Sequence, residues 1–154
     1  MAIAKIISGG QTGVDRAALD VALSRKMGCG GWCPEGRHAD DGPISEKYPL
    51  IETARTDHTV RTENNVKFSD GTLLFYRERF EGGTAYAKEM AEHLNKPVLV
   101  IDVSNPPDAQ IFKSWINDNK IRVIHIGGQR ECSSPGIYAR ARLLIENYLD
   151  HLAH

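Results

Sequence analysis

Three segments of the chain combine glycine with polar side chains at spacings suited to binding an anion. Each is expected to follow a strand and begin a helix: Gly9-Gly10-Gln11-Thr12, Gly82-Gly83-Thr84 and Gly128-Gln129-Arg130. Backbone N–H groups at a helix N-terminus have no intrahelical acceptor, and the helix dipole favours negative charge there. Glycine also lets the backbone approach a ligand closely. The segments therefore predict sites for a phosphate or another oxyanion.

Arg16 adds to this interpretation of the first segment. It falls in the first turn of a helix expected from Val14, where a cation opposes the helix dipole unless an anion lies beside it. The spacing of Gly9, Gly10 and Gly13 matches neither the dinucleotide-binding fingerprint nor a Walker loop, because no Gly-Lys-Ser/Thr follows. An ordinary tight turn in a parallel sheet is the alternative explanation.

The stretch 28–44 is a second candidate for function, because it is long and rich in glycine and charge. Long ordered loops are more often functional than decorative, although a surface loop with solvated charges is the alternative. Cys29 and Cys33 are spaced C-x-x-x-C near His38. A zinc site would need a fourth ligand and usually tighter pairing, so no metal site is predicted.

Alternating strands and helices are expected to position these segments. Apolar runs of strand length occur at 3–7, 72–76, 97–101 and 121–126, with a short strand at 31–33. Helices are expected from Val14, within 59–69, over 85–94 and 109–119, and after Pro135. Continuously apolar strands are typical of a parallel sheet covered on both faces. We therefore expect an α/β fold, Rossmann-like and in three α/β/α layers, with the three glycine segments along one edge.

Some side chains are expected to have structural roles. Thr84 and Ser134 are placed to cap the helices that follow them, the latter with Pro135 at the first helical position. Trp115 is expected in the core, and His125 is expected to be a hydrogen-bonded core residue rather than a ligand.

Composition limits the other classes of function. The 154 residues fit one domain, 1–154, with 41% hydrophobic and 25% charged residues. A net charge of −1 disfavours nucleic acid as a partner, and no apolar run approaches a membrane span. With no targeting segment recognised and an odd number of cysteines, three, we expect a cytoplasmic protein without a disulfide framework.

Six motifs in order, SGGQTGVDRAALD, GGWCPEGRHADDGPI, YPLIET, RTENNVKFSDGTL, EGGT and GGQRECSSPGIY, resemble those of the molybdenum cofactor carrier proteins. That family is a circularly permuted branch of the LOG-like, lysine-decarboxylase-like (SLOG) Rossmann superfamily. The resemblance runs from Ile6 to Tyr138. It implies a homo-oligomer, a dimer or tetramer, that binds the molybdenum cofactor or molybdate. The cofactor is a pterin with a phosphate monoester and a dithiolene-held molybdenum, and a molybdoenzyme is the implied recipient.

The resemblance also implies which residues contact the ligand. They are Gly9, Gly10, Gln11, Thr12, Asp15, Arg16, Arg37, Asp41, Ser69, Asp70, Gly82, Gly83, Thr84, Arg130 and Ser134. The chain departs from the family in its last loop, where Gly-Pro-Arg-Glu-Ser is replaced by Gly128-Gln129-Arg130-Glu131-Cys132. Arg130 is kept, and Cys132 is not expected to bind the metal.

Binding without catalysis is the favoured interpretation, because no nucleophile and base are evident as a pair. A sensor of a nucleotide or of an ADP-ribose-like ligand would use the same loops. A nucleoside monophosphate phosphoribohydrolase is the third reading. The superfamily's hydrolase motif is Pro-Gly-Gly-x-Gly-Thr-x-x-Glu, whereas here Glu89 stands five residues past Thr84 instead of three. On a helix its carboxylate would point roughly 200° further round, away from the loop.

Overall fold

A five-stranded parallel sheet forms the centre of the molecule. The computed structural model describes residues 3–54 and 58–153. The sheet has the order β2-β1-β9-β7-β8, and all its neighbouring strands pair in parallel. Its strands are β1 (Lys5–Ile7), β2 (Gly28–Gly30), β7 (Gly71–Tyr76), β8 (Val98–Asp102) and β9 (Val123–Gly128). The expected α/β, Rossmann-like arrangement is confirmed.

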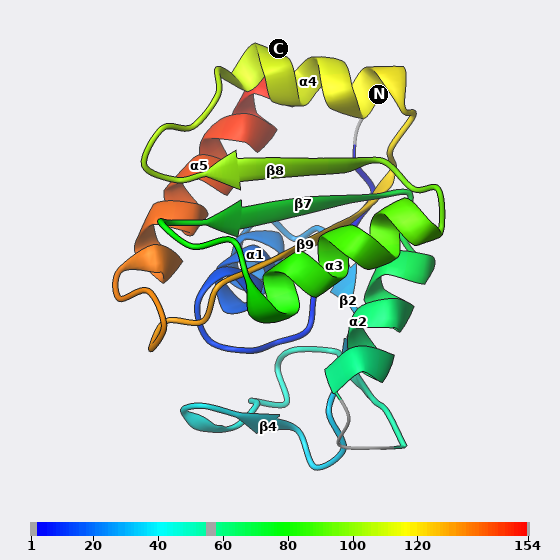
Figure 1. Ribbon diagram of the computed structural model, residues 1–154, viewed down its shortest axis with the longest axis vertical. Coiled ribbons are helices and arrows are strands. Elements are labelled where there is room, and N and C mark those ends of the chain that lie inside the picture. The colour runs from blue at the N-terminus through cyan, green and yellow to red at the C-terminus, as the bar shows by residue number, and fades with distance from the viewer. Residues whose placement is uncertain (1–2, 55–57, 154) are drawn as a thin grey trace.

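Helices cover both faces of this sheet (Figure 1). They are α1 (Val14–Ser24), α2 (His58–Lys67), α3 (Gly82–His93), α4 (Ala109–Asp118) and α5 (Ile137–Leu152). Helices α1 and α5 pack against each other on one face, and α2 and α3 lie together on the other. The Tyr86 hydroxyl of α3 donates to the Glu63 carboxylate of α2 over 2.8 Å, which ties the second pair together.

The main core lies between the sheet and the pair α1 and α5. Ile6, Ile124 and Leu73 of the central strands are buried there, beside the apolar stripes of the two helices. Helix α4 joins this core because Phe112 stacks on Tyr148 of α5, with ring centroids 5.0 Å apart. The apolar runs at 72–76 and 121–126 therefore correspond to the buried strands β7 and β9, whereas the run at 97–101 forms the edge strand β8, which is mostly half-buried.

The region 31–54 projects away from the sheet, at the bottom of the view in Figure 1. It contains two small ladders, the parallel pair β3 (Trp32–Cys33) and β6 (Ile51–Glu52), and the antiparallel pair β4 (His38–Ala39) and β5 (Gly42–Pro43). One side chain, Arg37, organises it by donating to the backbone carbonyls of Ile44, Ser45, Tyr48 and Leu50.

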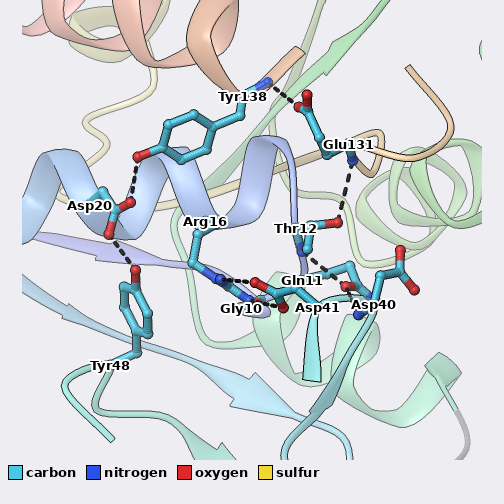
Figure 2. A network of polar contacts seen from close by, with 10 residues as sticks. All are labelled: Gly10, Gln11, Thr12, Arg16, Asp20, Asp40, Asp41, Tyr48, Glu131 and Tyr138. Carbon is cyan, nitrogen blue, oxygen red and sulfur yellow. Dashed lines mark hydrogen bonds and ion pairs between the residues drawn. The ribbon is translucent and has the colours of Figure 1, made fainter. Parts of the chain in front are cut away.

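Asp20 of α1 fastens this region to the body of the molecule. Its carboxylate accepts hydrogen bonds from the hydroxyl groups of Tyr48 in the projecting region and Tyr138 in α5 (Figure 2). Burial raises the pKa of both phenols, and the Asp20 carboxylate acts in the same direction. Three parts of the chain that are far apart in sequence are thus joined at one group.

The structure corrects two expected helix caps. Helix α3 begins at Gly82 with Glu81 as its N-cap, so Thr84 lies inside the first turn. Helix α5 begins at Ile137 after Gly136, and the Glu131 carboxylate accepts hydrogen bonds from the N–H groups of Gly136 and Tyr138. Glu131 therefore caps α5 in place of Ser134, and these backbone hydrogen bonds lower its pKa.

Other local predictions had mixed outcomes. Strand β2 was not expected, and the helix within 59–69 is α2. His125 is buried and hydrogen-bonds Thr72 over 3.2 Å, as predicted, whereas Trp115 is only partly buried. Within the part of the chain that the structure describes, no helix has the length and apolar character needed to cross a bilayer.

Candidate functional site

A cleft of about 830 Å³ opens at the carboxyl ends of the central strands. Residues from all three glycine segments line it, because parallel strands end at the same edge of the sheet. Helix α2 contributes Arg61 and Asn65 to the wall, and the segment between β7 and α3 contributes Arg77 and Arg79.

The N-terminus of α3 is open to this cleft. Gly82 has φ +60°, and a side-chain carbon added at Gly82 or Gly83 would meet nothing within 4 Å. The N-cap residue Glu81 makes no side-chain hydrogen bond to the helix. N–H groups of the first turn have no intrahelical acceptor, so here they can donate to a ligand oxygen.

Three arginines share the cleft with this helix end: Arg77, Arg79 and Arg130 line it, as do Glu78 and Glu81. Arg130 also pairs with Asp40 over 3.2 Å, and Arg77 donates to the Pro135 carbonyl. Gln129 holds the arginine segment in place: its Oε1 accepts from the Arg77 N–H over 2.7 Å, and its Nε2 donates to the carbonyls of Arg77 and Arg79, each over 3.0 Å. Gln129 therefore fixes two loops to each other.

The floor of the cleft carries a second group of polar side chains. Asp15 and Arg61 lie on either side of Gly9: a carbon added there would be 2.9 Å from Asp15 Oδ2 and 3.5 Å from Arg61 Nη1. The Nε and Nη1 atoms of Arg61 are buried and have no hydrogen-bond partner within residues 3–54 and 58–153. His125 lies close by, since a carbon added at Gly127 would be 3.3 Å from His125 Nε2 and 3.6 Å from Asp15 Oδ1.

Burial sets the protonation of this floor. It raises the pKa of Asp15 to about 6, against the opposing influence of Arg61 and of hydrogen bonds from Gln11 and Ser8. Burial also lowers the pKa of His125 to about 4, and the Arg61 charge acts in the same direction. At neutral pH the floor therefore holds an Asp15 carboxylate, an Arg61 guanidinium and a neutral imidazole.

A family model matches residues 6–149, which is nearly the whole chain. The chain belongs to the circularly permutated YpsA SLOG family. It is also similar to a crystal structure described as a "putative molybdenum carrier protein" from Syntrophus aciditrophicus SB. The two chains are 43% identical with a TM-score of 0.93, and the match covers 96% of each. Comparison with functionally curated proteins gave no match.

In this SLOG protein the structure brings about half of the expected ligand-contact residues to the cleft. Those that line it are Gly9, Gln11, Asp15, Gly82, Gly83, Thr84, Arg130 and Ser134. Their contact with a ligand stays a prediction.

The first glycine segment contributes its backbone and Asp15, and its helix end is closed. The Val14 N–H donates to the Gln129 carbonyl over 3.2 Å, and a carbon added at Gly13 would be 2.3 Å from that carbonyl oxygen. Thr12 accepts a hydrogen bond from the Glu131 N–H over 3.4 Å (Figure 2). The N-terminus of α1 is thus covered by the third glycine loop, and Thr12 serves this contact.

Arg16 has a partner within the protein. Its Nη1 lies 2.9 Å from Asp41, and its Nε and Nη2 donate to the Gly10 carbonyl (Figure 2). This contact holds the pKa of Asp41 below its usual range. The anion expected beside Arg16 is therefore Asp41, and Gly10, Arg16 and Asp41 together hold the projecting region instead of lining the cleft.

Three further residues expected to contact the ligand do not line the cleft. The guanidinium of Arg37 is taken up by backbone carbonyls. Ser69 is buried and donates to the Val66 carbonyl. Asp70 precedes β7 at the opposite, amino-terminal edge of the sheet, where it accepts from the N–H groups of Arg122 and Val123. Because strands run away from this edge, Ser69 and Asp70 are separated from the cleft by the length of β7.

Sequence reasoning missed Arg61, Asn65, Arg77 and Arg79. A signal existed for the first two, because positions four apart on a helix share a face and both lie in the conspicuous motif RTENN. Within residues 3–54 and 58–153, no group of three His, Cys, Asp or Glu side chains is arranged to hold a metal ion. Cys33 is buried, and Cys132 donates to Asp40 at the rim over 3.2 Å.

Proposed function

We propose that the protein binds the molybdenum cofactor in this cleft and carries it without transforming it. The open N-terminus of α3 is the observation that carries the proposal: Gly82 and Gly83 leave space beside donor groups, and Arg77, Arg79 and Arg130 supply positive charge. A phosphate monoester is the group that such an arrangement accommodates best. The similarity to a protein described as a putative molybdenum carrier supports the choice of ligand.

The interpretation as a carrier also has support from a side chain outside the cleft. Glu89, the carboxylate nearest in sequence to the hydrolase motif, is exposed on α3 and is not among the cleft residues. The proposal therefore assigns the cleft to binding and orientation. We extend it to a homo-oligomer that passes the cofactor to a molybdoenzyme, which light scattering and mixing with an apo-molybdoenzyme would test.

The test uses protein purified from cells that make the cofactor, measured by native mass spectrometry and elemental analysis. Wild type is expected to retain close to one molybdenum and one pterin per subunit. Gly83→Asp places a carboxylate in the open space at α3, and Gly83→Asn places a neutral group of the same size there. The aspartate variant is expected to lose the cofactor far more completely than the asparagine variant.

Both variants are expected to fold, because no atom lies within 4 Å of the added carbon and Gly83 does not have a positive φ. Equal retention by the two variants would show that the phosphate is not held at α3. If the wild-type protein contained a nucleotide and no molybdenum, the carrier function would be refuted and the nucleotide sensor would take its place.

A further inference from the structure

We infer that the floor of the cleft is a separate recognition subsite for the lactam edge of a pterin ring, at which Arg61 donates to the ring carbonyl and Asp15 accepts from the adjacent ring N–H. The inference rests on the proposed function for the choice of a pterin. It goes further in assigning the ring to two residues on different helices.

The first argument is the state of Arg61. Arg61 lines the cleft, and its buried Nε and Nη1 atoms have no hydrogen-bond partner among the described residues. Buried donors on a charged group are rarely left unsatisfied, because desolvation without a partner is costly. An acceptor atom on a ligand in the cleft would satisfy them.

The second argument is the gap between Arg61 and Asp15. Both approach the same position above Gly9, at 3.5 and 2.9 Å, yet the described residues show no direct ion pair between them. Any side chain at residue 9 would fill this gap, so glycine there keeps it open. A group that fits must accept on one side and donate on the other, which is the arrangement of a lactam C=O and N–H.

The third argument excludes a second phosphate at the floor. The Asp15 carboxylate faces the gap, and an anion placed there would be repelled by it. Surfaces beside the gap also suit a flat ring: the apolar Leu74 and the backbone of Gly127 lie close to Asp15, since a carbon added at Gly127 would be 3.6 Å from Leu74 Cδ2 and 3.6 Å from Asp15 Oδ1. The cleft therefore has an anionic-ligand end at α3 and a donor–acceptor end between α1 and α2.

The experiment titrates the purified protein with 6-hydroxymethylpterin and follows the pterin fluorescence. The matched probe is 2,4-diamino-6-hydroxymethylpteridine, in which an amino group replaces the ring carbonyl and would point its hydrogens at Arg61. The pterin is expected to bind at least tenfold more tightly than the diamino compound. Arg61→Gln and Asp15→Asn are each expected to reduce this preference about tenfold.

Arg25→Gln is the control variant, because Arg25 pairs with Asp150 on the surface away from the cleft, and it is expected to keep the full preference. Circular dichroism establishes that each variant is folded. Equal binding of the two probes, no pterin binding, or an unchanged preference in folded Arg61→Gln would overturn the inference.

The outcome is separable from that of the proposed function. Retention of whole cofactor by a protein that does not bind the pterin would refute the floor subsite alone. Pterin binding that depends on Arg61 in a protein that retains no cofactor would support the subsite and refute the carrier function.

Discussion

Replacement of Asp15 by asparagine is expected to make the unliganded protein more stable at neutral pH. The folded protein raises the Asp15 pKa from 3.8 to about 6, chiefly because burial penalises the carboxylate. A carboxyl group whose pKa is raised by folding destabilises the folded state wherever it is ionised. Asparagine has a similar shape and carries no charge, so it avoids this penalty.

The size of the effect follows from the two pKa values. Their difference corresponds to about 3 kcal/mol of unfolding free energy at pH 7.5, an upper bound because Asp15 keeps some contact with solvent. The gain is expected to fall as pH decreases from 6 towards 3.8, since the wild-type carboxyl becomes protonated. It should be about half as large at pH 5 and close to zero below pH 3.8.

Urea unfolding of wild type and variant at pH 7.5, 5 and 3.5 measures this dependence. Asp41→Asn is the matched control, because contact with Arg16 lowers the pKa of Asp41 and its carboxylate therefore stabilises the fold. That variant should lose stability at pH 7.5, by no more than about 1 kcal/mol for an exposed pair. A less stable Asp15→Asn at pH 7.5, or a gain that does not change with pH, would refute the account of the cleft floor.

Three other substitutions test separate parts of the structure. Folding lowers the His125 pKa to about 4, so between pH 6.5 and 4 the unfolded chain binds a proton that the folded protein does not, and the wild-type melting temperature falls. His125→Gln removes this group and should make the melting temperature less dependent on pH in that range. An unchanged pH profile would contradict this. Gly128→Ala should lower the free energy of unfolding by several kcal/mol, because the added carbon would lie 2.3 Å from the Phe75 carbonyl oxygen. The control Gly83→Ala adds its carbon in open space and should keep the wild-type midpoint of urea unfolding. Glu131→Gln should cost about 1 kcal/mol at pH 7 through weaker capping of α5, and the difference should disappear as pH falls below the lowered pKa of Glu131; a constant difference would argue against a charged cap.

The sheet could be predicted from sequence where burial leaves a continuous apolar run. This holds for β7 and β9, which are almost wholly buried, whereas the apolar run of β8 forms an edge strand that is mostly half-buried. Strand β2 could not be found in this way, because its sequence is Gly-Cys-Gly and it joins the sheet through backbone hydrogen bonds to β1. The cap of α5 was also missed, because Glu131 accepts from the N–H of Gly136, five residues later, and so lies outside the usual N-cap position.

The meeting of the glycine segments at one edge was predictable from strand direction alone, whereas the partners of the arginines were not. Arg16 meets Asp41 across 25 residues, and Arg37 meets carbonyls of its own region. Neither pairing can be predicted from the local sequence pattern, because both depend on how the region 31–54 folds back on itself and on α1. The place of Ser69 and Asp70 was unpredictable for a related reason: a motif next to a strand in sequence can lie at either end of that strand, and these two residues lie at the end of β7 away from the cleft.

The three strand-to-helix junctions show why glycine segments of similar sequence differ in function. At α1 the Gln129 carbonyl accepts from the Val14 N–H, and at α5 the Glu131 carboxylate caps the helix. Helix α3 begins with two glycines that have open space beside them, and its cap residue Glu81 makes no side-chain hydrogen bond to the helix. N–H groups at a helix end need an acceptor, which is water, another protein group or a ligand. The protein itself supplies that acceptor at α1 and α5, whereas at α3 a bound oxyanion would supply it. The site is thus distinguished by which helix end the protein leaves open.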